Sequence, residues 1–119
     1  MIIGIGVDVC QIDRYAAAEQ RRPGFSARWL TPAEVALPLS SRAARFAAKE
    51  ALAKALLSEG GLRWHDAEVT KDEHGRPRFL ISGTVAARAA ELGVDRIHLS
   101  ISHDAGIAAA YVICERLDS

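Results

Sequence analysis

Two acidic residues and a lysine are the side chains of this sequence best suited to act on phosphate groups. Glu50 and Lys54 stand one helical turn apart, about 40° from each other around a helix axis. Asp8 ends a short apolar strand, on the same face as Gly4 and Gly6. Two carboxylates that met at one point would repel each other unless a cation lay between them. Because Mg²⁺ takes one or two protein carboxylates and fills its shell with water and phosphate oxygens, this set predicts a magnesium–diphosphate site.

Each of these residues also has an explanation that needs no ligand. A glutamate four residues before a lysine is the favoured ion pair of a solvated helix face, which stabilises by about 0.2–0.5 kcal/mol. Asp8 could instead cap the helix that follows it by accepting hydrogen bonds from backbone N–H groups. The two glycines beside Asp8 leave room for another backbone or for a ligand.

One histidine lies where it could contact the same ligand. His103 follows an expected strand, where it could bind phosphate, hold a carboxylate or be satisfied by the backbone. The other histidines show no metal-ligand spacing with it, so a zinc site is not expected. Asp104 either joins the water shell of a metal or makes the turn that leads to Gly106, and the turn is favoured.

The elements that must position these residues follow from apolar periodicity and from capping signals. Thr31, Pro32 and Glu34 form a capping box with proline at the first helical position. The stripe Ala44, Ala48, Ala51 and Ala55 permits close packing of a long helix, which Gly60 and Gly61 are expected to close. Strands are expected over residues 2–9, 67–71, 78–81, 97–102 and 107–114, and helices over 11–20, 32–37, 41–59 and 83–92.

This order of elements predicts an α+β fold with a mostly antiparallel sheet packed against one long helix. The near-continuous apolar run over residues 107–113 predicts a last strand that is buried on both faces. A length of 119 residues with half of them apolar predicts one globular domain over 1–119 and excludes disorder of the whole chain. If a chain this short must enclose a large ligand, oligomerisation is a natural way to supply the missing walls.

Composition also bears on partners and compartment. Fifteen basic and fifteen acidic residues cancel, so no nucleic-acid partner is expected. No apolar run is long enough for a membrane helix, and residues 1–9 lack the basic leader of a secretory signal. Cys10 and Cys114 show no metal spacing, which favours a reduced, cytoplasmic protein.

The charge is unevenly distributed along the chain. Residues 1–65 hold nine basic and six acidic side chains, whereas residues 66–119 hold six and nine. Arg14, Arg21, Arg22 and Arg28 gather in the first part, which predicts a basic patch able to steer an acidic macromolecule. A solvated helix face is the alternative.

Taken together, these residues resemble the holo-acyl-carrier-protein synthases, the small group of 4′-phosphopantetheinyl transferases. The resemblance spans the chain from Ile3 to about Leu117 and is strongest in a ten-residue helix motif. Its segments are Gly4-Ile5-Gly6-Val7-Asp8 with Arg14, the motif Phe46-Ala47-Ala48-Lys49-Glu50-Ala51-Leu52-Ala53-Lys54-Ala55 preceded by Arg45, the central pieces Trp64 to Val69 and Gly75-Arg76-Pro77, and Ser100-Ile101-Ser102-His103.

The resemblance implies the phosphopantetheinyl transferase fold and a set of roles. Asp8 and Glu50 would hold Mg²⁺ together with the diphosphate of coenzyme A. A carrier serine attacks the β-phosphorus and 3′,5′-ADP leaves, while Lys54 stabilises the charge that develops on the leaving group. The base for the serine proton is either Glu50 or a water on the metal that Asp8 holds. Arg45, Lys54, Ser102 and His103, with Gly75 and Pro77 as a wall, would bind the nucleotide, and His103 would belong to the catalytic set.

The same resemblance implies a homotrimer with active sites between subunits and an acyl carrier protein as partner. Arg14 is assigned to carrier docking by the motif, whereas Arg21, Arg22 and Arg28 are inferred from their charge. The expected setting is fatty acid biosynthesis, with polyketide biosynthesis as a further candidate.

Two other functions compete with a transferase. An ATPase of the actin and hexokinase type also uses a glycine-rich strand and an aspartate near Mg²⁺, but here the glycines precede Asp8 and the chain is too short for two lobes. A non-catalytic trimeric binding module would use Glu50 and Lys54 only as a structural pair.

Overall fold

The computed structural model describes residues 1–118, and its elements follow the expected order. The strands are β1 (Ile2–Gln11), β2 (Ala67–Lys71), β3 (Pro77–Ile81), β4 (Arg96–Asp104) and β5 (Ile107–Glu115). The helices are α1 (Ile12–Arg21), α2 (Phe25–Trp29), α3 (Pro32–Val35), α4 (Leu39–Ala55), the short 3₁₀ helix η1 (Trp64–Asp66) and α5 (Gly83–Leu92). The predicted α+β class is confirmed.

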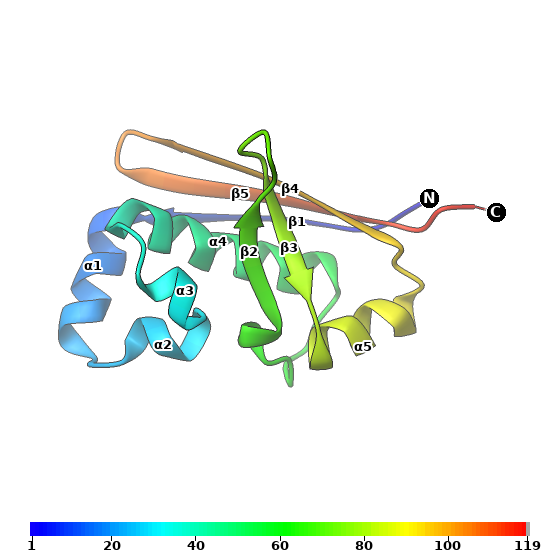
Figure 1. The fold of residues 1–119 in the computed structure, drawn as a ribbon, viewed down its shortest axis with the longest axis horizontal. Coiled ribbons are helices and arrows are strands. Elements are labelled where there is room, and N and C mark those ends of the chain that lie inside the picture. The colour runs from blue at the N-terminus through cyan, green and yellow to red at the C-terminus, as the bar shows by residue number, and fades with distance from the viewer. Residues whose placement is uncertain (119) are drawn as a thin grey trace.

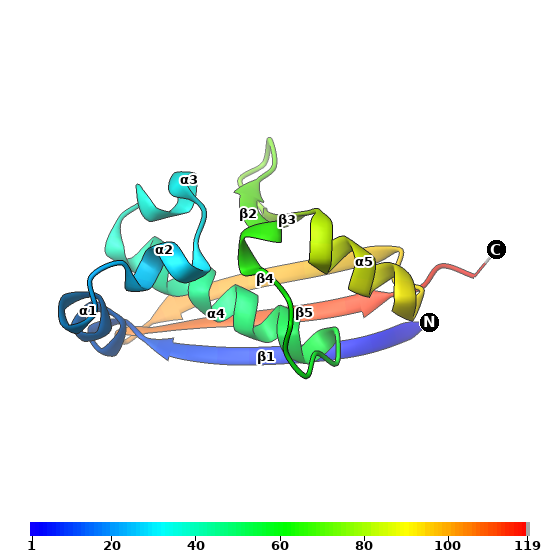
Figure 2. The same ribbon diagram turned by 90° about the horizontal axis from the view of Figure 1, so that it is seen from below.

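The strands form two antiparallel sheets. One sheet has the order β1-β5-β4, and β2 and β3 form a separate hairpin. All the helices lie on one face of the three-stranded sheet, with α4 along it and α1 and α5 at opposite ends (Figure 2). The hairpin of β2 and β3 crosses over β4 on the same side as the helices (Figure 1).

The contact between α4 and β1 depends on two glycines. A Cβ at Gly4 would lie 1.9 Å from the carbonyl oxygen of Ala55, and one at Gly6 would lie 1.8 Å from that of Ala51. Any side chain at these positions would therefore push the helix away from the strand. The space that the glycines were expected to leave is filled by a helix backbone, and the alanine stripe is buried as predicted.

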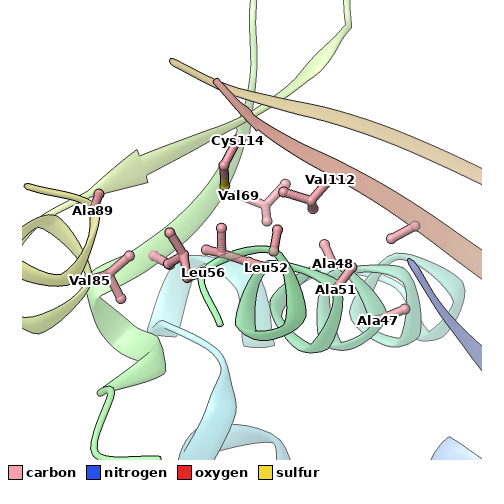
Figure 3. Close-up of a cluster of buried hydrophobic side chains, with 13 residues drawn as sticks. Ala47, Ala48, Ala51, Leu52, Leu56, Val69, Val85, Ala89, Val112 and Cys114 are labelled. Atoms are coloured by element: carbon pink, nitrogen blue, oxygen red, sulfur yellow. The ribbon is translucent and has the colours of Figure 1, made fainter. Parts of the chain in front are cut away.

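The main core lies between α4, the sheet, the hairpin and α5 (Figure 3). Leu52 and Leu56 from α4 meet Val112 of β5, Val69 of β2 and Val85 of α5, and all five side chains are buried. This packing holds α4 rigidly across the sheet, so the residues along α4 have defined directions relative to β1 and β4.

The long helix does not end where the glycines predicted. Leu57, which follows the C-cap Leu56, has the left-handed φ of 52°, and Ser58 donates from its backbone N–H to the carbonyl of Ala53. The Arg88 guanidinium donates to the carbonyls of Leu56 and Leu57 at 3.1 and 3.0 Å. A distant arginine therefore completes the helix end, before the chain reaches Gly60 and Gly61.

Three other expectations need correction, and one helix is additional. The first strand continues through Gln11, so Asp8 lies inside it, and Asp104 belongs to β4, whereas Ala105 and Gly106 make the turn. Helix α2 was not expected. The last strand is buried on one face only: Ile107 and Tyr111 are 42% and 58% exposed. They share a bare apolar sheet face with Ile5, Val7 and Val9 of β1.

Candidate active site

Lys54 joins the glycine-bearing strand to α4. Its ammonium donates to the carbonyl oxygen of Val7 at 2.9 Å and contacts Asp8 Oδ1 at 3.3 Å. Among the described residues, Lys54 thus pairs with Asp8 and forms no ion pair with Glu50. Asp8 also does not cap α1, because Gln11 is the N-cap and accepts no side-chain hydrogen bond.

Glu50 lies close enough to Asp8 for the two carboxylates to repel each other. Burial raises the pKa of Glu50, the charge of Asp8 raises it further, and Lys54 opposes both effects. Burial, and after it the charges of the same two carboxylates, raise the pKa of the Cys10 thiol on β1. The structure therefore brings Asp8, Glu50 and Lys54 together, from a strand and a helix that lie far apart in the sequence.

The donor set fits a hard divalent cation that shares its shell with phosphate. The cluster carries two carboxylates against one ammonium, which leaves one negative charge uncompensated. No group of three or more candidate ligands occurs in residues 1–118, so the chain offers no closed all-protein cage. Two carboxylates are enough for Mg²⁺ when phosphate oxygens and water supply the other positions, and the nearby ammonium can then pair with the phosphate.

A second cluster surrounds a cavity of about 190 Å³ on the other side of α4. It brings together four residues of the expected nucleotide site, and it adds Lys71, which the sequence analysis missed. The lining includes Arg45, Gly75, Pro77, His103 and Lys71.

Arg45 is the side chain of this cavity that most clearly indicates a ligand. It is 7% exposed, and its Nε is a buried donor with no hydrogen-bond partner. Burial lowers the pKa of Arg45, against the raising effect of Glu34 and Glu68. A buried guanidinium that lines a cavity with an unused donor is suited to bind an anion, because an unsatisfied buried donor is costly.

Ser102 does not join this cavity. In β4, His103 pairs with Ala108 and lies on the helix side of the sheet, whereas Ser102 pairs with Ala109. Successive residues of a strand point to opposite faces, so Ser102 lies on the bare face.

The two clusters do not form one site within a single chain. Arg45 and Lys54 lie nine residues apart on α4, about 180° around its axis. Asp8 lies on β1 and His103 on β4, which are the two outer strands of the sheet. Helix α4 therefore separates the acidic cluster, which consists of Asp8, Glu50 and Lys54, from the anion cavity that Arg45 and His103 line.

An apolar cavity of about 220 Å³ opens beside the acidic cluster. Its lining includes Cys10, Tyr15, Phe25, Phe46 and Arg14. The rings of Tyr15, Phe25 and Phe46 lie within 5.6–5.9 Å of one another. No pattern in the sequence indicated this cavity, although Phe46 stands one turn before Glu50.

The four arginines of the expected basic patch are all exposed. Arg14 and Arg21 lie two helical turns apart on the same face of α1, and Arg28 lies on α2. None of the four, Arg22 included, forms an ion pair with another described residue. Their charge is therefore available to a partner.

A buried ion pair that the sequence did not reveal lies next to Glu50. Lys49 is fully buried, and its ammonium contacts Glu34 Oε1 at 2.6 Å. Lys49 also donates to the carbonyls of Trp29 and Trp64. Glu34 is the acid of the predicted capping box, which the structure confirms.

The class of protein follows from comparison with known families. A model of the 4′-phosphopantetheinyl transferase superfamily matches residues 4–112. The chain is 57% identical, over 97% of its length and 97% of the relative's, to the holo-[acyl-carrier-protein] synthase of Clavibacter michiganensis. The chain belongs to the holo-acyl-carrier-protein synthase family, and it is an enzyme, a phosphopantetheinyl transferase.

Solved structures support the same assignment. The holo-[acyl-carrier-protein] synthase of Neisseria meningitidis superposes with a TM-score of 0.89 at 31% identity, and covers 98% of this chain and 100% of that one. The enzyme from Helicobacter pylori, in complex with coenzyme A, gives a TM-score of 0.82 at 33% identity, and the match covers 93% of this chain and 99% of that one.

No helix within residues 1–118 is both long and apolar enough to cross a bilayer.

Proposed function

We propose that this enzyme transfers the 4′-phosphopantetheine group of coenzyme A to a serine hydroxyl of an apo-acyl carrier protein. The phosphoanhydride bond breaks as the serine oxygen bonds to the β-phosphorus, and 3′,5′-ADP leaves. The serine proton would pass to Glu50 or to a water held beside Asp8. The convergence of Asp8, Glu50 and Lys54 carries this proposal, because it provides two hard ligands and a cation at one point. Residues 1–119 act as one transferase domain.

Asp8 and Glu50 would hold Mg²⁺ between β1 and α4. The bound metal would neutralise the diphosphate and polarise the phosphorus that is attacked. The Val7 carbonyl holds the Lys54 ammonium beside the two carboxylates, where it would stabilise the negative charge that develops on the leaving group. The close packing of Gly4 and Gly6 against α4 keeps the two carboxylates in register, which limits the reorganisation needed for reaction.

Arg45, Lys71 and His103 bind the nucleotide phosphates of coenzyme A, with Gly75 and Pro77 as a wall. The unused donor of Arg45 and the cationic lining of its cavity support this assignment. Ser102 takes no part in this cavity of the same chain.

The active site lies between subunits of a homotrimer. One coenzyme A can use both clusters if the acidic cluster of one copy faces the anion cavity of another, because α4 separates them within one chain. The bare sheet face, with Ile5, Val9 and Tyr111 more than half exposed, supports association of copies. The number of copies rests on the family resemblance.

The partner protein is an acidic carrier that docks on α1 and α2. Arg14, Arg21, Arg22 and Arg28 supply the complementary charge, and the apolar cavity beside Arg14 supplies a place for an apolar carrier side chain. We place the enzyme in fatty acid biosynthesis in the cytoplasm, where the thiols of Cys10 and Cys114 stay reduced.

A mass assay tests the function directly. The purified chain is incubated with coenzyme A, Mg²⁺ and an apo-acyl carrier protein, with parallel reactions that contain EDTA or ATP alone. We expect the carrier to gain the mass of one phosphopantetheine only when coenzyme A and Mg²⁺ are present. ATP turnover without carrier modification would indicate the ATPase, and neither reaction would indicate a binding module.

A further inference from the structure

A polar network outside the active site joins α1 to the beginning of α4. Arg42 of α4 donates to both carboxylate oxygens of Glu19 on α1, at 2.7 and 2.8 Å. Ser26 of α2 donates its hydroxyl proton to the same carboxylate. Tyr15 of α1 therefore donates to the Ser26 oxygen, at 2.5 Å.

The network is more than a surface ion pair. The side chains of Arg42 and Glu19 are only 20% and 21% exposed, and Tyr15 and Ser26 are buried. Arg42 also donates to the carbonyl of Leu37, just before α4. The Arg42 contact lowers the pKa of Glu19, so the carboxylate stays charged at neutral pH. A two-point contact of this kind fixes direction as well as distance.

Helix α1 depends on such contacts for its placement. It has ten residues, and its N-cap makes no side-chain hydrogen bond, so it is too short to be stable alone. Its beginning is held by the Ile12 N–H, which donates to the carbonyl of Gly106 at 2.9 Å. Glu19 lies near its end, one turn after Tyr15 on the face that packs inward.

We infer that the network of Tyr15, Ser26, Glu19 and Arg42 is a positioning device that sets α1 for carrier docking. Arg14 and Arg21 lie on the exposed face of the same helix, and Tyr15 lines the apolar cavity beside Arg14. Rotation of α1 after loss of the network would displace both charges and deform the cavity together. The anion cavity, which is proposed to bind the nucleotide, shares no residue with the network. This inference rests on the proposed docking of an acyl carrier protein.

The test separates carrier binding from coenzyme A binding. We would measure KM for apo-carrier and for coenzyme A with Glu19→Gln, Arg42→Gln and the double variant. We expect the carrier KM to rise about fivefold to twentyfold in each single variant, and the coenzyme A KM to stay within about twofold. Because both residues act through one contact, the double variant should be no worse than the singles. Arg42→Lys keeps the charge without the two-point contact, and should raise the carrier KM even if the glutamine variants fold poorly.

Arg88→Gln is the matched control. Arg88 has a similar exposure of 28%, and it also donates to main-chain carbonyls, but at the other end of α4. It should lower thermal stability and leave both KM values unchanged. The inference is wrong if the KM values for carrier and for coenzyme A rise together, or if Arg88→Gln raises the carrier KM equally. It is also wrong if the wild type is active and the Glu19 and Arg42 variants have the same carrier KM as the wild type. An inactive wild type would instead reject the proposed function.

Discussion

Helix α4 carries two lysines whose surroundings differ in almost every physical respect. Lys49 is completely buried against one carboxylate, that of Glu34, at 2.6 Å. Lys54 has a side chain that is 56% exposed, and it contacts Asp8 at 3.3 Å with Glu50 as a second carboxylate nearby. One cluster is neutral and closed, whereas the other is open and carries excess negative charge.

The difference lies in how fully each group is satisfied. Lys49 has three oxygen acceptors, and Glu34 accepts from the backbone N–H groups of Thr31 and Val69 as well. These contacts tie α2, η1 and β2 to α4, and they repay the cost of burying two charges. At Asp8 and Glu50 the compensation within residues 1–118 is only partial, because the exposed Lys54 ammonium is the one cation set against two carboxylates. A cluster with every partner present acts as scaffold, and a cluster that lacks one is prepared for a ligand.

Breaking the closed cluster should have the largest effect on folding. Lys49→Ala leaves the Glu34 carboxylate buried without its cation, so we expect a loss of about 3–5 kcal/mol in the free energy of unfolding. Lys54→Ala removes a largely exposed contact, and we expect a loss of under about 1 kcal/mol. Urea unfolding followed by circular dichroism measures both. Equal losses at the two lysines would contradict the distinction between the clusters.

Breaking the open cluster should affect activity instead. Asp8→Asn and Glu50→Gln keep the shape of each side chain but remove a negative charge, so we expect transfer to fall by at least about a hundredfold. Both variants should remain folded by circular dichroism. Glu59→Gln, at an exposed glutamate beyond the end of α4, is the control and should transfer normally. Near-normal turnover of either site variant at saturating Mg²⁺ would refute the metal roles.

How far the sequence predicts these features depends on whether their causes are local. The glycine face of β1 and the alanine stripe of α4 are local patterns that the sequence reveals one by one, and the structure shows that they pack against each other. The capping box of Glu34 was equally visible, but its pairing with Lys49 was not, because no short-range spacing reveals a partner on another element. The end of α4 was misplaced for the same reason, since Arg88 supplies the cap from α5.

The nucleotide cavity shows the same limit. The sequence motifs indicated Arg45 and His103, but Lys71 joins them only through the placement of the hairpin over β4. Ser102 was assigned with His103 because the two are adjacent in the motif, and the strand alternation places them on opposite faces. Likewise, the positions of Arg45 and Lys54 on opposite sides of α4 divide a site that a linear motif presents as one.

The smallest expected effect is a change in the thermal stability of the metal-free protein when the charge of Glu50 is removed. Burial and Asp8 raise the folded-state pKa of Glu50 above its ordinary value of 4.5, so ionised Glu50 destabilises the fold at neutral pH. The stability from this group is complete below pH 4.5 and is lost as the pH rises through the folded pKa.

Glu50→Gln should therefore raise Tm by a few degrees at pH 7.5, and the gain should vanish near pH 4. Differential scanning fluorimetry of both proteins in EDTA measures it. A gain that is independent of pH, or a lower Tm in the variant at pH 7.5, would mean that ionised Glu50 does not destabilise the fold, so that burial and Asp8 together do not raise its pKa.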